Sequence, residues 1–270
     1  MSVKKFIPIL LFSMSCIGIY AQQADMSRPW KNKKCAISLT YDDGLNVHLD
    51  KVIPVLDSLN IKGTFYIPGN STTATNRISD WRKAASRGHE LGNHTLFHAC
   101  VGGTPDRSWV KPDYDLSKYT AQRMIDEVLM ANTFLSAIDG RTKRTFAYTC
   151  GDMVVDNVHF MDSIKNNFVS ARGVKSEMLP LAKIDIWNIG SYMMVNASAD
   201  QMINLVKEAM KTNSYLVFLF HGVGGEHNLN VSADEHRKLV QFLKQNEKDI
   251  WIAPFIEVSE YIVDYKSRNK

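Results

Sequence analysis

Three short stretches combine acidic and imidazole side chains in patterns that suit chemistry. The stretch "TYDDG" places Asp42 and Asp43 side by side at the end of an apolar run. The stretch "GNHTLFH" carries His94 and His98 at i, i+4 spacing, which puts both imidazoles on one face if the segment forms a helical turn. The stretch "VFLFHGVG" ends an apolar run in His221. Each alone also has a structural interpretation, since Asp-Asp-Gly is a turn signal and isolated histidine pairs are common.

Together these five side chains form the set that metal-assisted hydrolysis needs. Catalytic zinc takes three protein ligands and leaves one coordination position for water, and two histidines with one carboxylate are an established combination. Adjacent strand residues point in opposite directions, but a turn at Gly44 would let both carboxylates face one centre, one to bind metal and one to take a proton. Paired charge at a buried strand end is costly without a cation. A divalent metal ion is therefore expected, Zn²⁺ above all, although cobalt, nickel and iron suit the same ligands.

Alternating strands and helices are expected to bring these side chains together. Apolar strand-like runs alternate with amphipathic stretches from residue 33 to residue 263, with no internal repeat or linker. The expected strands are 35–40, 62–69, 89–93, 144–149, 167–173, 215–220 and 249–255. The expected helices are 49–59, 77–87, 117–138, 156–166 and two that begin at the capping-box pairs Ser198/Gln201 and Ser232/Glu235. This order predicts an α/β fold with a parallel sheet, whose working groups collect at the carboxyl ends of the strands.

The first residues have the layout of a secretory signal peptide. Lys4 and Lys5 precede a short apolar run that closes on Ala21, and Pro8 interrupts this run, so it is poorly suited to span a bilayer. The expected organisation is a signal peptide at 1–21, an N-terminal extension at 22–32, one domain at 33–263 and a C-terminal tail at 264–270. The mature protein is expected to be secreted or periplasmic, and a retained membrane anchor is the alternative.

Composition excludes several classes of partner and chemistry. Removal of residues 1–21 lowers the formal net charge from +4 to +2, and so small a positive charge does not indicate binding to nucleic acid or to an anionic membrane. No second hydrophobic segment of membrane length follows. Cys35, Cys100 and Cys150 would remain, and this odd number allows one disulfide at most. No Gly-x-Ser-x-Gly occurs, which disfavours a serine hydrolase.

The three stretches resemble motifs of the polysaccharide deacetylase family, the NodB homology domain of carbohydrate esterase family four. "TYDDG" is similar to the first motif of that family, "HTLFH" to the second, His-(Ser/Thr)-x-x-His, and "VFLFHGVG" to the fifth. The approach "RGHELGNHT" also resembles the lead into the second motif. The resemblance covers about residues 35 to 258. It implies a single-domain, distorted (β/α) barrel of about seven units that removes acetyl groups from an acetylated polysaccharide or oligosaccharide.

The resemblance also implies a role for each matching residue. Asp42 would be the catalytic base, and the metal ligands would be Asp43, His94 and His98. His221 would be the general acid that protonates the leaving nitrogen or oxygen. The backbone amide of Cys150 would help the metal to hold the tetrahedral oxyanion.

The third motif is where the chain departs from the family. In "FAYTCG", Ala147 stands where the family has the arginine that orients the base, and strand alternation puts Arg144 on the opposite face. Cys150 falls at the position of the motif's tyrosine, and its side chain is expected to be a small buried hydrophobe.

The fourth motif is at best "DIWN", residues 185–188. Asp185 would raise the pKa of His221 and Trp187 would pack against the acetyl methyl, or both are ordinary strand residues. His227 is expected at the rim of the site. Tyr41 is expected in the core, and the histidines expected to be structural or on the surface are His48, His89, His159 and His236.

The expected function is therefore a metal-dependent deacetylase of N-acetylated carbohydrate. An O-acetyl esterase on xylan-like glycans is the nearest alternative, because the same attack by water serves amides and esters. The missing third-motif arginine allows another alternative, a carbohydrate-binding pseudoenzyme of the same fold. The sequence identifies neither the sugar nor the oligomeric state.

Overall fold

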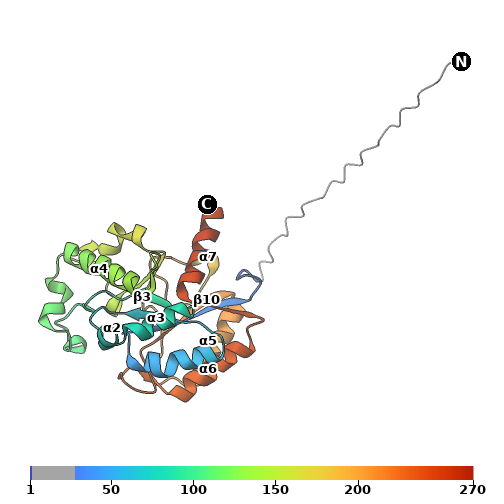
Figure 1. Ribbon diagram of the computed structural model, residues 1–270, viewed down its shortest axis with the longest axis horizontal. Coiled ribbons are helices and arrows are strands. Elements are labelled where there is room, and N and C mark those ends of the chain that lie inside the picture. Colours follow the sequence, from blue (N-terminus) through green and yellow to red (C-terminus); the bar gives the residue numbers. More distant parts are fainter. Residues whose placement is uncertain (2–27, 270) are drawn as a thin grey trace.

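The computed structural model describes Met1 and residues 28–269 (Figure 1). The predicted signal peptide, beyond Met1, lies outside the described residues. Trp30, from the predicted extension, is fully buried and its indole donates a hydrogen bond to the Asn213 carbonyl at 2.8 Å. At the other end of the chain, helix α7 (Phe255–Arg268) includes most of the residues predicted as a tail. Within residues 28–269, no helix has both the length and the apolarity that crossing a bilayer requires.

A nine-stranded sheet that curls into a distorted barrel forms the centre of the molecule. Seven strands follow one another in the spatial order β7, β4, β3, β2, β1, β10, β8, while β13 pairs with β1 and β9 with β10. These strands are β1 (Cys35–Asp42), β2 (Thr64–Ile67), β3 (Glu90–Asn93), β4 (Thr145–Ala147), β7 (Ser170–Arg172), β8 (Leu179–Pro180), β9 (Tyr192–Met193), β10 (Ser214–Phe220) and β13 (Ile250–Ile252). All pairs from β7 to β10 are parallel. The predicted α/β fold, a single-domain distorted barrel, is confirmed.

Helices cover the outside of this sheet. They are η1 (His48–Val52), α1 (Ile53–Ser58), α2 (Thr72–Asn76), α3 (Ile78–Ser86), α4 (Ala121–Asp139), α5 (Ala199–Thr212), α6 (Ala233–Gln245) and α7. Helix α5 packs against α6, and α3 packs against α4. The capping box predicted at Ser198 and Gln201 is present. Ser232 also caps its helix, but the Glu235 carboxylate turns away to accept from the amide of Ala199, which ties α6 to α5.

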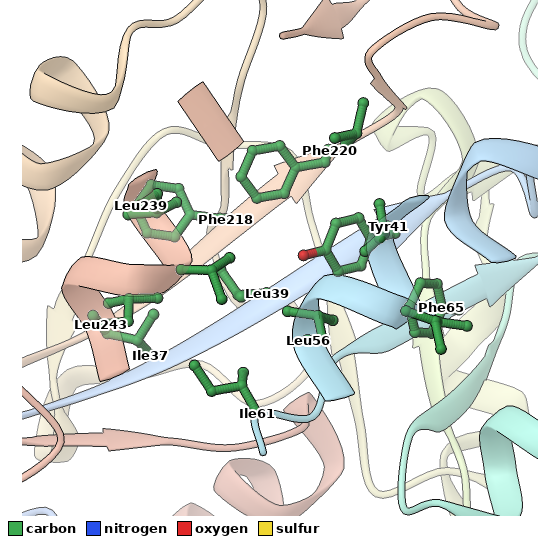
Figure 2. Close-up of a cluster of buried hydrophobic side chains, with 14 of the residues drawn as sticks. Ile37, Leu39, Tyr41, Leu56, Ile61, Phe65, Phe218, Phe220, Leu239 and Leu243 are labelled. Atoms are coloured by element: carbon green, nitrogen blue, oxygen red, sulfur yellow. The ribbon is translucent and has the colours of Figure 1, made fainter. Parts of the chain in front are cut away.

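The core lies between the sheet and these helices. Strands β1 and β10 are buried along their whole length, and the continuously apolar run 215–220 predicts this for β10. Tyr41 lies at the centre of the cluster in Figure 2, stacked on Phe65 at 5.0 Å and on Phe220 at 5.4 Å between ring centroids. The prediction that Tyr41 is a core residue is confirmed. Truncating a side chain of such a cluster to alanine typically costs about 2–5 kcal/mol, so this packing fixes the strand ends that carry the site.

The helix predicted at 156–166 is wrong. A two-stranded hairpin, β5 (Val154–Val155) with β6 (Val158–His159), stands at its start, followed by short 3₁₀ turns. Asp156 and Asn157 form the hairpin turn with φ of 51° and 59°, a conformation that Asp and Asn adopt more readily than other non-glycine residues. The apolar residues that suggested a helix, Phe160 and Ile164, are nevertheless buried.

Candidate metal and catalytic site

The residues predicted to bind metal, act as base and acid, and hold the oxyanion meet in a cleft of about 890 Å³ at the carboxyl ends of the parallel strands. Strand register explains this convergence. Tyr41 pairs with Phe220, so β1 and β10 end at the same level, with Asp42 and His221 as the residues that follow this pair. The other strands of the parallel set end at the same edge, and their loops complete the cleft.

The two adjacent carboxylates face one centre because the chain turns immediately after β1. Asp42 is the last residue of the strand, whereas Asp43 has a φ of 77° and Gly44 a φ of 59°. This left-handed pair reverses the alternation that would otherwise send the side chains to opposite sides. Gly44 tolerates the turn because it lacks a Cβ atom, and one built there would lie 3.1 Å from Ile67 Cγ2. The turn predicted at Gly44 is present, one residue early.

The second stretch is a loop held by its own polar side chains, not a helical turn. Thr95 and His98 have φ of 64° and 53°. The Thr95 amide donates to Asn93 Oδ1 at 2.8 Å, and the His98 amide donates to Thr95 Oγ1 at 2.9 Å. These two bonds bring the His94 and His98 rings to a centroid separation of 4.8 Å. The histidines therefore converge by a different local structure from the one that the i, i+4 spacing suggests.

Asp43, His94 and His98 form a cluster whose chemistry fits a divalent cation. Their potential ligand atoms all lie within 4.8 Å of one another. Asp43 Oδ1 lies 3.2 Å from His98 Nε2 and 3.7 Å from His94 Nε2, yet this buried oxygen accepts no hydrogen bond from the described residues. Tetrahedral zinc bonds of 2.0–2.1 Å separate neighbouring ligand atoms by about 3.3 Å. An unsatisfied carboxylate oxygen facing two imidazole nitrogens at that spacing fits a shared cation.

The tautomer of His94 suits a ligand. Its Nδ1 lies 2.9 Å from the Ala147 carbonyl, which only accepts, so Nδ1 carries the proton and Nε2 presents its lone pair to the carboxylates. Burial lowers the pKa of His94 to about 4, although Asp42 opposes this shift. Burial raises the pKa of Asp43, but the surrounding imidazoles, His98 first, outweigh it and hold that pKa well below its usual range. His94 is thus neutral and Asp43 ionised near pH 7, the forms that bind metal.

Arg172 holds the carboxylate of Asp42, and no sequence motif predicts this contact. Its Nη2 donates to Asp42 Oδ2 at 2.5 Å across the barrel, and both side chains are buried. Ser191 Oγ accepts from Nη1 at 3.2 Å and fixes the other side of the guanidinium. In the sheet, Arg172 pairs in register with Ala147, the position where the family has its arginine. The remaining Asp42 oxygen, Oδ1, is buried and has no hydrogen-bond partner among the described residues.

His221 lies on the other side of Asp43. Its Nε2 is 3.9 Å from Asp43 Oδ2, and its backbone carbonyl is 2.8 Å from His48 Nε2, so His48 fixes the strand end. Burial lowers the pKa of His221, and the nearby carboxylates, Asp42 first, oppose that effect. His221 Nδ1 is buried without a hydrogen-bond partner among residues 28–269. The His227 ring stacks on His221 at 4.9 Å between centroids and lines the cleft, as its predicted rim position suggests.

Asp185 and Trp187 lie outside this cleft. Asp185 Oδ1 accepts from the Trp187 amide at 2.9 Å, and Asp185 borders a separate small pocket. Neither side chain lines the cleft, and the charges that act on His221 come from other residues. The tuning role predicted for Asp185 therefore has no geometric basis in this structure. Arg172, in "NFVSARG", does enter the site. The sequence signal that could have identified it is a charged residue inside a buried strand.

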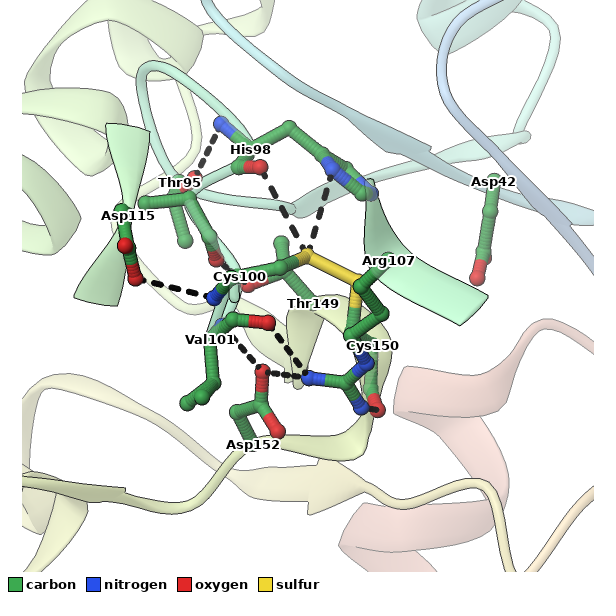
Figure 3. Close-up of a disulfide and its surroundings, with 12 residues drawn as sticks. Asp42, Thr95, His98, Cys100, Val101, Arg107, Asp115, Thr149, Cys150 and Asp152 are labelled. Atoms are coloured by element: carbon green, nitrogen blue, oxygen red, sulfur yellow. Dashed lines mark hydrogen bonds and ion pairs between the residues drawn. A yellow bond between two sulfur atoms is a disulfide. The ribbon is translucent and has the colours of Figure 1, made fainter. Parts of the chain in front are cut away.

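Cys150 is half-buried and forms a disulfide with Cys100, the one bridge that the three cysteines allow, so the expectation of a small buried hydrophobe is wrong (Figure 3). It lies in a 3₁₀ turn with a φ of 55° and lines the cleft, so its backbone is at the site. Arg144 is on the opposite face, as predicted, where it pairs with Asp139 at 2.8 Å.

Three exposed apolar side chains border the charged centre. Trp109 is 59% exposed and lines the cleft together with Val174 and Met193. The Trp109 ring lies 6.4 Å from the His98 ring, centroid to centroid. Apolar side chains left in water at the edge of a polar cleft are typical of a ligand-binding surface.

Comparisons with known proteins identify a family model and several relatives. A model of the polysaccharide deacetylase family matches residues 30–165. The peptidoglycan-N-acetylglucosamine deacetylase of Bacillus cereus is 22% identical over 212 residues, which cover 78% of this chain and 64% of that protein. The Bacillus subtilis protein YlxY, which is uncharacterized, is 28% identical over 106 residues, 39% of this chain and 28% of that protein. The chain thus spans less than two thirds of the length of these curated relatives.

Solved structures share the fold at low sequence identity. A Mycobacterium smegmatis protein assigned to the polysaccharide deacetylases matches with a TM-score of 0.62 and 14% identity, covering 87% of this chain and 92% of that one. A family 4 acetyl xylan esterase from Clostridium thermocellum, in complex with a cobalt ion, matches at 0.53 and 17%, covering 82% and 89%. A CE4 family pseudoenzyme from Bacillus anthracis matches at 0.52 and 14%, covering 84% and 66%.

Proposed function

The chain belongs to the polysaccharide deacetylase family, and from that premise we propose that it is a divalent-metal-dependent hydrolase that removes acetyl groups from N-acetylated carbohydrate. One observation carries the proposal: Asp43, His94 and His98 converge within 4.8 Å in a cleft that Asp42 and His221 flank. Asp43, His94 and His98 would hold the cation, Zn²⁺ above all. When bound, such a cation polarises the acetyl carbonyl and lowers the pKa of water.

Asp42 is the base in this proposal. Arg172 occupies Oδ2 and leaves Oδ1 free, so the carboxylate has one fixed oxygen and one oxygen available to take a proton from the attacking water. The guanidinium also compensates the buried charge of the Asp42 carboxylate. The Oδ2 atom of that carboxylate lies 3.9 Å from His94 Nε2. This arrangement supports turnover in a chain whose third motif lacks its arginine.

His221 is the acid, which gives its proton to the leaving nitrogen. The backbone bond to His48 fixes its position, and stacking on His227 limits rotation of its ring. The backbone amide of Cys150, which borders the same cleft, would donate to the developing oxyanion. The exposed face of Trp109 suits the apolar face of a sugar ring, which supports a carbohydrate as substrate.

Export of the protein is part of the proposal. The N-terminal layout of a signal peptide supports it, and so does the Cys100–Cys150 disulfide, because disulfides persist in oxidising compartments and are rare in the cytosol.

An O-acetyl esterase is the second candidate. The observation that favours it is the unpartnered Nδ1 atom of His221, since no carboxylate among the described residues accepts a hydrogen bond from that nitrogen. An amine leaving group needs protonation more urgently than an alkoxide. Replacement of His221 by alanine should therefore reduce N-deacetylation more than O-deacetylation on matched glycans, and equal losses would argue against the acid role.

Acetate release from N-acetylated and O-acetylated oligosaccharides by the zinc-loaded protein tests the proposal. Asp42→Asn should keep its metal content and lose about 10²- to 10⁴-fold in rate, the range for a general base. Asp156→Asn, an exposed change in the β5–β6 hairpin turn at a residue that does not line the cleft, is the matched control and should keep the parent rate. No acetate release from any substrate by a metal-loaded parent protein would instead indicate a pseudoenzyme.

A further inference from the structure

The disulfide lies directly against the metal-ligand cluster and shares His98 with it. Cys100 Sγ is 3.8 Å from His98 Nδ1 and 3.7 Å from the His98 carbonyl oxygen, the two contacts drawn from the sulfur in Figure 3. The potential ligand atoms of His98, Cys100 and Cys150 lie within 4.8 Å of one another, as do those of the Asp43 cluster. One imidazole therefore stands between two sets of donor atoms.

We propose that His98, Cys100 and Cys150 are a second metal site, which forms when the disulfide is reduced. The two sulfurs then act as thiolate ligands and, with His98, bind a divalent cation of the Zn²⁺ or Co²⁺ class. Occupation of this site withdraws His98 from Asp43 and His94. The inference goes beyond the proposed function and depends on it only where acetate release is the readout.

The ring nitrogens of His98 make the two sites mutually exclusive. Nε2 faces Asp43 Oδ1 at 3.2 Å, and Nδ1 faces Cys100 Sγ. A neutral imidazole carries one proton and therefore offers one nitrogen lone pair. A cation held by the sulfurs takes Nδ1, and the proton must then sit on Nε2, where it points at Asp43. The oxidised disulfide has no thiolate to offer, so it leaves the Nε2 lone pair to Asp43 and His94.

The donor set and its access suit a metal ion. Arg107 donates from Nη2 to the Cys150 carbonyl at 3.1 Å and from Nη1 to Asp152 at 2.6 Å, which fixes the turn that carries Cys150. Thiolates with imidazole are ligands that zinc prefers. Cys150 lines the cleft, so a reductant and a cation can reach it, whereas Cys100 is fully buried behind it.

The chemistry balances with a dithiol reductant. The dithiol gives two electrons and two protons, its own sulfurs close to a disulfide, and the Cys100–Cys150 bond opens to two thiols. The cation then displaces the two thiol protons to solvent. Cys35 does not compete, since burial raises the pKa of its thiol to about 12.

Cobalt spectroscopy tests the site without any substrate. The full-length protein, oxidised or reduced with a dithiol and freed of it anaerobically, is titrated with Co²⁺ alone. We expect a sulfur-to-cobalt charge-transfer band in the near ultraviolet only after reduction. Reduced Cys35→Ser should retain the band, and the reduced double variant Cys100→Ser, Cys150→Ser should lack it. Reduced His98→Ala should bind Co²⁺ at least about tenfold more weakly at the sulfurs.

His94→Ala separates this inference from the proposed function. It removes a ligand of the Asp43 cluster only, so it should bind Co²⁺ weakly when oxidised and regain tight binding with the charge-transfer band when reduced. Circular dichroism of each reduced variant checks that it remains folded. A folded, reduced parent protein without the band would overturn the second site, whatever its activity. So would a band that persists in the double variant.

Where the parent protein releases acetate, reduction in the presence of Co²⁺ should suppress that activity, and re-oxidation should restore it. The activity of the double variant should not respond to the reductant. Full acetate release by a reduced parent protein that displays the charge-transfer band would show that the two sites do not compete for His98.

Discussion

The two halves of the active cleft differ in how they are built. The Asp43 half comes from two loops that each follow one strand and carry their ligands within a few residues. The Arg172 half is assembled across the barrel, since Arg172 on β7 reaches Asp42 on β1, 130 residues away in sequence. A local turn can be inferred from its own residues, whereas a contact across a barrel depends on strand register. The four predictions below test this difference, from the largest expected effect to the smallest.

Removal of a ligand from the local half should have the largest effect. His94→Ala deletes the imidazole whose Nε2 lone pair faces the two carboxylates. We expect the affinity of the oxidised protein for Zn²⁺ to fall by more than about 100-fold, beyond what second-sphere changes cost. Because the variant then holds no zinc, acetate release at limiting zinc concentration should also be lost. Competition titration against a chromophoric chelator measures the affinity.

His227→Ala is the matched control for that experiment. His227 Nε2 lies as close to Asp43, 3.8 Å from Oδ2, but the Leu229 amide donates to His227 Nδ1 at 2.9 Å. Because Nδ1 accepts, Nε2 carries the proton and has no lone pair for a metal. The variant should bind zinc as the parent protein does. A loss equal to that of His94→Ala would mean that this tautomer assignment, and the ligand set, are wrong.

Much of the local half was predictable from sequence. The strand ends, the turn after Asp43 and the pair of histidines follow from apolar runs, Asp-Asp-Gly and a short spacing. The local structure that brings His94 and His98 together was not predictable. Their spacing suggests a helical turn, whereas the side chains of Asn93 and Thr95 hold the segment as a loop. The roles of the site residues come from the family motifs, and the structure shows that these residues lie together in the cleft.

The other half escaped prediction for physical reasons. The third motif lost its arginine at Ala147, and the replacement comes from the register partner on the next strand, which no local pattern indicates. The Cys100–Cys150 pairing was one of several that three cysteines allow. The helix predicted at 156–166 failed because a two-residue turn outcompeted the helical period of its apolar residues.

Arg172→Gln tests the contact across the barrel. It should leave zinc affinity unchanged and lower kcat by about 10²-fold, since a base displaced by about 1 Å can cost that much. Its KM should stay near the parent value, because the guanidinium is buried behind Asp42. Steady-state kinetics with metal analysis of the same samples separates these effects.

Arg144→Gln provides the comparison, since Arg144 is as deeply buried and pairs with Asp139, away from the cleft. Breaking a buried ion pair commonly costs about 3–5 kcal/mol, so both variants should unfold at lower denaturant concentration. Only the Arg172 variant should lose kcat. Equal kcat values in the two variants would reduce Arg172 to a structural role.

A smaller effect, on the free energy of unfolding, is expected from His236 in the core beneath the Asp43 half of the cleft. His236 is buried, its Nε2 lies 2.8 Å from the Tyr41 hydroxyl, and burial lowers its pKa to about 3, with a minor contribution from His48. The unfolded chain takes up a proton near pH 6.5 and the folded chain does not, so the stability due to neutral His236 is present above pH 6.5 and falls as the pH drops towards 3. At pH 5 this loss is about 2 kcal/mol.

Urea unfolding at pH 7.5 and pH 5 measures that loss. His236→Gln should reduce the difference in unfolding free energy between the two pH values by about 2 kcal/mol. His159→Gln, at an exposed position, should leave the difference as it is in the parent protein. An unchanged difference in His236→Gln would show that other groups cause the acid sensitivity.

The smallest effect is expected where the sequence suggested a tuning carboxylate. Asp185 accepts from the Trp187 amide and borders a separate pocket, and the carboxylates that raise the pKa of His221 are Asp42 and Asp43. Asp185→Asn should therefore leave kcat and the basic limb of the pH–rate profile, which the general acid sets, unchanged, while His221→Asn lowers kcat. If Asp185→Asn shifted the basic limb to lower pH, the Asp185 carboxylate would reach His221 during turnover. The half of the cleft assembled across the barrel would then include a residue that the strand register does not bring there.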